Sequence, residues 1–328
     1  MQDEDDEDDG EDYEYLPERD WLDGLGAGAM AVIGTAAFAL AILFMALSNQ
    51  IGGARTGEAA SLAEDAAFEA PAPRIARSQP RAGDPAWLRH AAPFAASPDT
   101  PLVAVIVLDD GTATGAAMGA LDWSAPLTFA VAADFDDSPH TVQRIRRAER
   151  EALAILPFGY GPAFGRDPNV IRRGLPEGEL LRRVRWHLAR AGDGIVGAVD
   201  ARAGDIVRDI AALRTVGEAL AGEGLLMIDS RSDPDGLVGA RLRPMGIPVG
   251  RRTVHIRRDA LPDEAFAALT DAERHAFTWG TAIVLVEAAG ATMETLSEWL
   301  RTKGDSVAVA PVSHVVRRLR KGPQHAGR

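Results

Sequence analysis

The sequence contains no cysteine, and its acidic residues outnumber its basic ones. The first absence excludes disulfide bonds and thiolate–metal sites, although it does not indicate a cellular compartment. The 35 basic residues stand against 48 acidic ones, which gives a net charge of −13. A nucleic-acid partner needs a basic face, so this charge balance argues against one.

Much of the acidic excess lies in residues 1–23, where the like charges predict a disordered tail. Residues 24–47 contain no charged side chain, and at about 1.5 Å per residue they are long enough to cross the hydrocarbon core of a bilayer. The preceding region is acidic where a signal peptide is basic, so we predict one uncleaved transmembrane helix over residues 24–48. Trp21 would lie at the interface. A buried helix of a soluble domain is the alternative.

Residues 49–100 are rich in Pro, Ala and Arg and show no clear periodicity, which predicts a linker that tethers a folded domain. One arginine precedes the apolar segment and five lie in this linker. The positive-inside rule would therefore place the C-terminal part in the cytoplasm. Long domains cross membranes regardless of this bias, so the rule leaves the orientation open.

From residue 101 onward, apolar runs rich in β-branched residues alternate with segments of helical spacing, such as 176–191 and 205–224. The runs lie at 102–108, 127–132, 152–157, 195–199, 225–228, 254–256, 281–286 and 307–312. Such alternation predicts a parallel sheet covered by helices. The number of runs favours an α/β fold of the distorted (β/α) barrel type over residues 101–316, with a doubly wound sheet as the alternative. Residues 317–328 are expected to form a basic tail.

Acidic residues stand where several of these runs end. Asp109 and Asp110 follow the first run, Asp200 follows a later one, and Asp229 another. Ligands of parallel α/β folds gather at the carboxyl ends of the strands. The sequence therefore predicts a site at this edge, where paired carboxylates are typical of metal ligands or a general base.

Two of the segments, VIVLDDG and LLMIDSR, resemble the divergent polysaccharide deacetylase family of bacterial envelope proteins. Further similar segments lie, in matching order and spacing, at 154–159, 174–190, 194–204, 246–259 and 294–300. The resemblance covers residues 101–315 and implies a distorted (β/α) barrel behind an N-terminal membrane segment. It also implies a periplasmic domain anchored in the inner membrane, with a glycan or an envelope protein as partner.

In the related active deacetylases, a divalent metal held by one Asp and two His activates water, and a second Asp acts as general base. The resemblance implies that Asp109 is the base and Asp110 the metal ligand. It places Asp229, Ser230 and Arg231 at the rim of the pocket.

The imidazoles of that family pattern are missing from this sequence. Ile155 stands where a His precedes Leu-Pro, Asp200 or Ala201 replaces a second His, and residues 286–290, VEAAG, replace a Gly-His-Pro. One carboxylate cannot hold a catalytic metal, because such sites use three protein ligands. We therefore expect no cofactor, or a divalent ion such as Zn²⁺ if the protein is active.

An oxygen-rich metal site could instead draw on the segment DFDDSPH together with Asp110. Its candidate ligands are Asp134, Asp136, Asp137 and His140. The other interpretation is that this segment begins a helix, with Asp137 or Ser138 as N-cap and Pro139 at the first helical position.

The remaining histidines do not suggest ligands. His187 lies in a helical segment among arginines and is expected to be exposed. His255 lies near Arg251, Arg252 and two further arginines, which disfavour its protonation and metal binding. The arginines could bind an anionic ligand, such as a glycan carboxylate or phosphate, or form a solvated loop.

Three hypotheses follow from the sequence. The chain is a catalytically degenerate deacetylase-like protein of envelope carbohydrate metabolism, an active N-deacetylase with other metal ligands, or a non-enzymatic membrane-tethered scaffold or glycan-binding module. We favour the first, and the sequence leaves open whether the protein is an enzyme.

Overall fold

The computed structural model describes residues 83–134, 137–159, 169–201, 204–231, 236–305 and 307–321. The predicted acidic tail, the transmembrane segment 24–48 and most of the linker lie outside these residues. Among the helices in the described ranges, none has the length and apolar character needed to cross a membrane.

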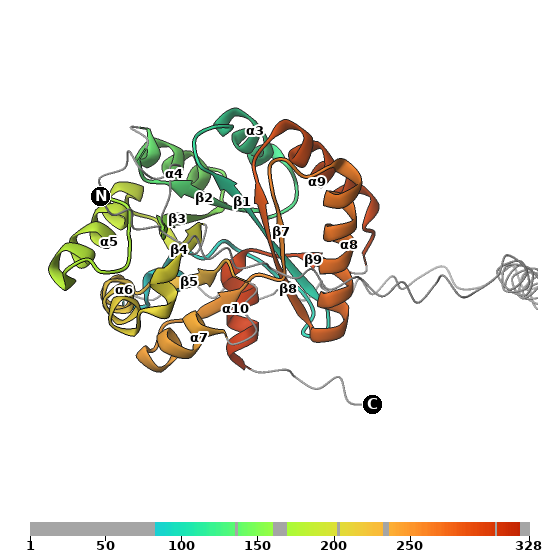
Figure 1. Ribbon diagram of the computed structural model, residues 1–328. Helices are drawn as coiled ribbons and strands as arrows, with labels where there is room; N and C mark the ends of the chain where they lie inside the picture. Colours follow the sequence, from blue (N-terminus) through green and yellow to red (C-terminus); the bar gives the residue numbers. More distant parts are fainter. Residues whose placement is uncertain are drawn as a thin grey trace, which may run out of the picture. The chain divides into compact units, whose positions relative to one another are not determined.

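A curled sheet of parallel strands forms the centre of the domain (Figure 1). Its spatial order is β6-β5-β4-β3-β2-β1-β8-β7, and β9 pairs with β1. The strands are β1 (Leu102–Asp109), β2 (Thr128–Ala132), β3 (Glu151–Pro157), β4 (Ile195–Ala201), β5 (Leu226–Asp229), β6 (Val249–Arg251), β7 (Val254–Ile256), β8 (Thr281–Glu287) and β9 (Ala308–Val309). All the pairings between them are parallel. The result is a half-barrel with β6 and β7 at its two ends, consistent with the predicted (β/α) barrel class.

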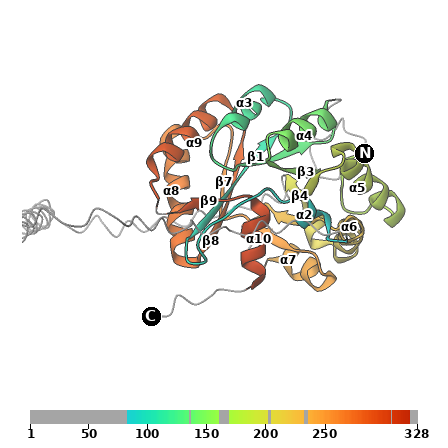
Figure 2. The same ribbon diagram turned by 180° about the vertical axis from the view of Figure 1, so that it is seen from behind.

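Helices cover the convex face of this sheet, as both views of the molecule show (Figures 1 and 2). The helices of the described residues are α2 (Ala86–Arg89), α3 (Thr114–Gly119), α4 (Ser138–Arg147), α5 (Glu177–Ala191), α6 (Ile210–Glu223), α7 (Leu237–Leu242), α8 (Pro262–Trp279), α9 (Gly290–Thr302) and α10 (Val312–Lys321). Of these, α10 and Trp87 of α2 pack on the concave side instead. In α6, the Asp209 carboxylate accepts the Ala212 N–H at the start, and Gly224 ends the helix with a φ of 65°. Such caps satisfy the backbone groups that a helix leaves unpaired at its ends.

The concave face of the sheet carries a second apolar cluster, into which α10 packs. Val312, Val315 and Val316 are buried there against strand side chains such as Ile283. A Cβ atom on Gly250 would lie 2.7 Å from Ile283 Cδ1 and 3.0 Å from Val316 Cγ2, so the close approach of α10 to β6 requires glycine. The interior of the half-barrel is therefore filled with side chains, as in other packed barrels.

A buried carboxylate fixes α10 at the amino-terminal end of the sheet, which we call the barrel floor (Ala92, Thr128, Glu151 and Ser313). Glu151 accepts hydrogen bonds from the Ala92 N–H, the Ser313 N–H and the Ser313 hydroxyl. The Thr128 hydroxyl accepts the Val312 N–H at 3.1 Å. These contacts tie the first turn of α10 to the starts of β2 and β3.

The folded domain is larger than the predicted range 101–316. Trp87 of α2 is buried in the concave cluster, and α10 runs through Lys321. Residues 317–321 are therefore helical, although the sequence placed them in a basic tail. The apolar run at 307–312 divides into the two-residue strand β9 and the start of α10, because its valines continue at helical spacing to Val315 and Val316. The short strand β6 was not predicted.

Candidate functional site at the barrel mouth

The carboxyl ends of the strands form the other end of the half-barrel, which we call the barrel mouth. Asp109 ends β1, Asp229 ends β5 and Glu287 ends β8, while Asp200 is the penultimate residue of β4. Because the strands are parallel, these carboxyl groups lie at one edge of the sheet. They fall into two groups, one around β1, β7 and β8 and the other at β4 and β5.

Asp109 is almost fully buried at the start of the loop that leads into α3. Its Oδ1 accepts the Gly111 N–H at 3.0 Å and the Thr114 hydroxyl at 2.9 Å. Burial raises the pKa of Asp109, and these two hydrogen bonds oppose the rise. The side chain is thus held in one orientation by its own loop.

Asp110 faces an arginine that the sequence did not single out as its partner. The Arg258 guanidinium donates to the Asp110 carboxylate, to the Thr112 hydroxyl and to Glu287 Oε2. The Thr112 hydroxyl also donates to Asp110 Oδ1 at 2.7 Å. Burial alone would raise the pKa of Asp110, but the Thr112 hydrogen bonds and the Arg258 charge hold it below its ordinary value.

Glu287 completes this group, which we call the mouth ion cluster (Asp110, His255, Arg258 and Glu287). Its Oε1 lies 3.1 Å from His255 Nε2, and Arg258 lies on its other oxygen. The contact with His255 is the main cause that lowers the pKa of Glu287 to about 2. His255 therefore faces a carboxylate, although its sequence neighbours are arginines.

Sequence reasoning did not propose Glu287 as a site residue, yet a signal was present. It belongs to the VEAAG segment, which stands where the family pattern has Gly-His-Pro at the end of the last long strand. The structure places that segment at the mouth, where Glu287 receives Arg258 and His255.

The second group is a pair of buried carboxyl groups, the acid pair (Asp200 and Asp229). Asp200 Oδ1 accepts the Ser230 N–H at 2.5 Å, and Oδ2 has no hydrogen-bond partner among the described residues. Burial, together with the charge of Asp229, raises the pKa of Asp200 to about 8. At neutral pH the folded protein therefore keeps Asp200 protonated.

The other predicted ligand-binding residues surround this acid pair. Asp229 Oδ1 accepts the Arg231 N–H at 3.1 Å, and Ser230 is nearly buried. The Arg252 guanidinium donates to the Ser230 carbonyl and lies in the field of both carboxyl groups. Arg251 ends β6 and is exposed. The two arginines thus differ in burial, because Arg252 is partly buried near the acid pair and Arg251 is exposed.

The family's metal does not fit the side chains present at the mouth. Ile155 packs into the concave apolar cluster, and the Asp110 carboxylate forms an ion pair with the Arg258 guanidinium. Within the described parts of the chain, no group of three or more His, Asp and Glu side chains is arranged to hold a metal ion. A site built from one Asp and two imidazoles lacks both imidazoles here.

The alternative ligands in DFDDSPH do not gather around Asp110 in the described residues. Asp137 is paired with His140 at 3.0 Å on the surface, and Asp136 lies outside the described residues. The helix interpretation is confirmed, since α4 begins at Ser138 with Pro139 in its first turn. Asp137 is the N-cap residue, one of the two predicted alternatives, but its side chain makes no cap hydrogen bond, and the Ser138 hydroxyl donates to the Ala132 carbonyl.

The expectation that His187 is exposed is wrong. Its side chain is 1% exposed in α5, and Nε2 lies 3.0 Å from the Asn169 carbonyl oxygen. His187 follows Val184 by three residues and precedes Ala191 by four, and both are buried. That spacing placed it on the apolar face of the helix, and the neighbouring arginines obscured the signal.

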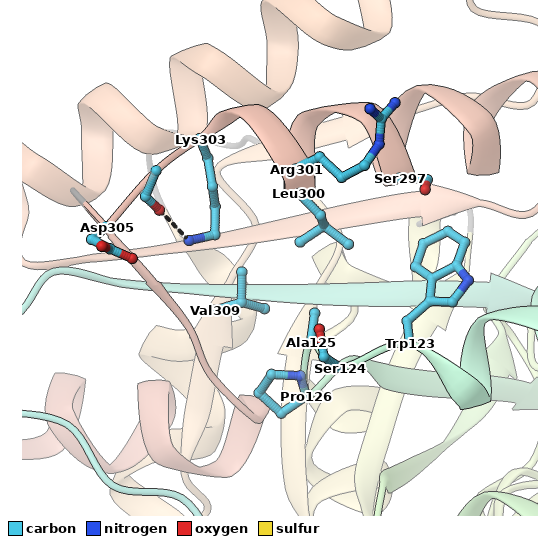
Figure 3. Close-up of a pocket in the computed structure, with 11 residues that line it drawn as sticks. Trp123, Ser124, Ala125, Pro126, Ser297, Leu300, Arg301, Lys303, Asp305 and Val309 are labelled. Atoms are coloured by element: carbon cyan, nitrogen blue, oxygen red, sulfur yellow. Dashed lines mark hydrogen bonds between the residues drawn. The ribbon is translucent and has the colours of Figure 1, made fainter.

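A separate pocket lies on the side of the domain, between α9 and the loop before β2 (Figure 3). It has a volume of about 570 Å³ and is bordered by Trp123, Pro126 and Leu300. Lys303 reaches into it and donates to the Gly304 and Val307 carbonyls, both at 2.8 Å. None of the carboxyl groups of the mouth lines this pocket, so we do not assign the site to it.

Comparison with known proteins identifies the family of this chain. The model of the divergent polysaccharide deacetylase family matches residues 105–316. An uncharacterized protein from Agrobacterium tumefaciens is 24% identical, with a TM-score of 0.63, over 70% of this chain and 94% of its own. The catalytic domain of a peptidoglycan N-acetylglucosamine deacetylase from Eubacterium rectale is 10% identical, with a TM-score of 0.42, over 67% of this chain and 92% of its own. No curated protein matches.

Proposed function

Because the chain belongs to the divergent polysaccharide deacetylase family, we propose that it is a non-hydrolytic member that binds an envelope glycan at the barrel mouth. In this proposal residues 24–48 anchor it in the inner membrane and the barrel lies in the periplasm. The observation that carries the proposal is the Arg258 guanidinium on Asp110, the one carboxylate that the family pattern assigns to a metal.

Amide hydrolysis by water needs a group that stabilises the developing oxyanion, and its loss costs several kcal/mol of transition-state stabilisation. The resemblance assigns this task to a metal. In this chain Asp110 is committed to Arg258 and Thr112, and Ile155 is apolar. We therefore derive no hydrolytic step for the protein.

The groups that remain at the mouth suit binding. The mouth ion cluster presents both donors and acceptors, because partly exposed Arg258 and Asp110 belong to it. Sugar hydroxyls are recognised by such a mixed set, because each hydroxyl both donates and accepts. Exposed Arg251 would supply a cation for a glycan carboxylate or phosphate.

Metal analysis tests the absence of hydrolysis. The purified full-length chain is loaded with Zn²⁺, Co²⁺ or Mg²⁺, and metal content and acetate release from N-acetylglucosamine oligomers are measured. We expect well below one metal per chain and no acetate above a no-protein blank. Asp110→Ala is the matched variant: one metal per chain in the wild type that this variant loses would establish the active-enzyme alternative.

Retention on insoluble peptidoglycan tests the binding role. We expect Arg251→Ala to weaken retention about tenfold, as loss of a charge-assisted hydrogen bond would. Arg241→Ala removes another exposed arginine, on α7, and should leave retention unchanged. If the wild-type chain is not retained, or if both variants behave alike, the scaffold interpretation replaces this one.

A C-terminal alkaline phosphatase fusion tests the location. This reporter is active only outside the cytoplasm, so the proposal expects activity. An inactive fusion, together with an active cytoplasmic reporter at the same position, would place the barrel in the cytoplasm, as the arginines of the linker suggest.

A further inference from the structure

Two aromatic side chains stand exposed in the last turn of α8. Trp279 is 70% exposed and Phe277 is 68% exposed, the largest exposures of any large hydrophobic side chain in the described residues. Single exposed hydrophobic residues are ordinary, but two exposed aromatic side chains in the last turn of one helix give that helix end an unusually apolar surface.

These aromatic residues are connected to the basic end of α10. The Gly280 carbonyl, directly after Trp279, accepts the Leu102 N–H at 3.0 Å. Thr100 lies two residues before Leu102, and its carbonyl accepts a hydrogen bond from the Arg318 guanidinium. Both helix ends lie toward the lower edge in Figures 1 and 2, where β1 and β8 begin. We call these two helix ends together the basal rim (Phe277, Trp279, Leu319, Arg320 and Lys321).

The last turn of α10 gives the basal rim its charge. Its valines are buried, so Leu319, Arg320 and Lys321 are left on the exposed side. The guanidinium of Arg320 lies 5.7 Å from the centre of the Trp87 ring, which orients it. Arg318 carries a further positive charge, which interacts electrostatically with the carboxylate of Asp99.

We propose that the basal rim docks on a bilayer surface that carries anionic lipid headgroups. Aromatic rings favour the headgroup region, and each nearby Lys or Arg adds attraction to an anionic leaflet. Phe277 and Trp279 enter this region, while Arg320 and Lys321 contact headgroup phosphates.

The path of the chain supports a bilayer as the occupant. Trp87, four residues into the described domain, contacts Arg317 and Arg320 of α10, so the linker enters the domain beside the basal rim. This step rests on the proposed anchor at residues 24–48. An anchored domain is held near its own membrane, so a weak docking surface is sufficient. Docking at the barrel floor turns the mouth away from the membrane, toward the envelope glycan.

The absence of cysteine allows a site-specific test in the full-length chain. Phe277→Cys places a fluorescent label on the basal rim. Ile210→Cys places the same label at an exposed apolar residue in the first turn of α6, on the mouth side. Each labelled protein is reconstituted into vesicles of phosphatidylcholine, alone or with phosphatidylglycerol, that contain a headgroup-attached quencher.

We expect quenching at position 277 in the anionic vesicles and little at position 210. Arg320→Gln with Lys321→Gln should lower the ratio of docked to undocked protein about 30-fold, since two charges near an anionic surface are removed. The proposal would be overturned by equal quenching at both positions or by no quenching at either. It would also be overturned if the protein failed to float with the vesicles. Energy transfer between labelled copies at position 277 would do the same, in favour of self-association. Peptidoglycan retention is measured separately, so loss of docking and loss of glycan binding are distinguishable.

Discussion

Both ends of the half-barrel bury carboxyl groups, but they satisfy them in different ways. At the barrel floor, three protein donors point at Glu151. At the mouth, Asp200 receives one backbone N–H and leaves Oδ2 without a partner in the described residues. On the other side of the mouth, Asp110 is neutralised by a guanidinium.

The two ends differ in how the cost of burying a carboxyl group is offset. A buried polar group costs stability unless hydrogen bonds replace its water, and Glu151 has those bonds. Asp200 avoids the cost of a buried charge by staying protonated, since burial raises its pKa to about 8. Asp200 is therefore less completely satisfied by hydrogen bonds than Glu151.

The largest effect is expected at the floor. Glu151→Ala leaves the Ala92 N–H, the Ser313 N–H and the Ser313 hydroxyl buried without an acceptor. We expect the free energy of unfolding to fall by about 3–5 kcal/mol, measured by urea denaturation. Glu223→Ala removes an exposed carboxylate and should change it by less than about 0.5 kcal/mol.

A loss below about 1 kcal/mol for Glu151→Ala would contradict the comparison. It would mean that water replaces the carboxylate at the floor and that α10 does not depend on it. Cleavage of α10 by protease in the variant is a second measurement, because the Ser313 contacts hold its first turn.

The next effect depends on pH and concerns the acid pair. Between the ordinary pKa of 3.8 and the folded value of about 8, folded Asp200 holds a proton that the unfolded chain releases. The free energy of unfolding therefore falls as pH rises through this range, by up to about 1.4 kcal/mol per pH unit from this group. Asp200→Asn does not titrate, so its stability relative to wild type should rise by about 2–3 kcal/mol from pH 5 to pH 7.

Urea denaturation at the two pH values measures this difference, and titrating groups that do not interact with Asp200 cancel because both proteins contain them. Asp193→Asn, at an exposed turn before β4, should differ from wild type by less than about 0.5 kcal/mol at both values. A parallel pH dependence for wild type and Asp200→Asn would show that Asp200 is ionised when folded.

The sequence predicted the architecture well because its signals are local. Apolar runs such as 102–108 and 281–286 became β1 and β8 almost residue for residue. The acids at strand ends were expected at one edge, and parallel pairing places them there. The three-residue strand β6 was missed, because residues 249–251 carry little periodicity. The start of α10 was missed because its first valine continues the apolar run at 307–312.

The candidate site was less predictable, because its contacts join residues far apart in the chain. Arg258 and Asp110 are separated by 148 positions, and nothing in either neighbourhood indicates the pair. His187 and His255 were judged from adjacent arginines, whereas the folded chain surrounds them with Asn169 and Glu287. Charge neighbours in sequence predicted neither environment, because a side chain's surroundings are set by the packing of distant elements.

The smallest effect tests whether Arg258 holds Asp110, as the proposed function requires. A double-mutant cycle with Asp110→Asn and Arg258→Met should give a coupling of about 1 kcal/mol in the free energy of unfolding, reduced in 1 M salt. The matched control is the Arg257–Asp259 pair, 3.0 Å apart but about twice as exposed, whose coupling should be smaller. If both couplings are equal, the guanidinium does not restrain Asp110, and this carboxylate would be as available to a metal ion as in an active deacetylase. The argument against a metal at the barrel mouth would then depend on the missing imidazoles alone.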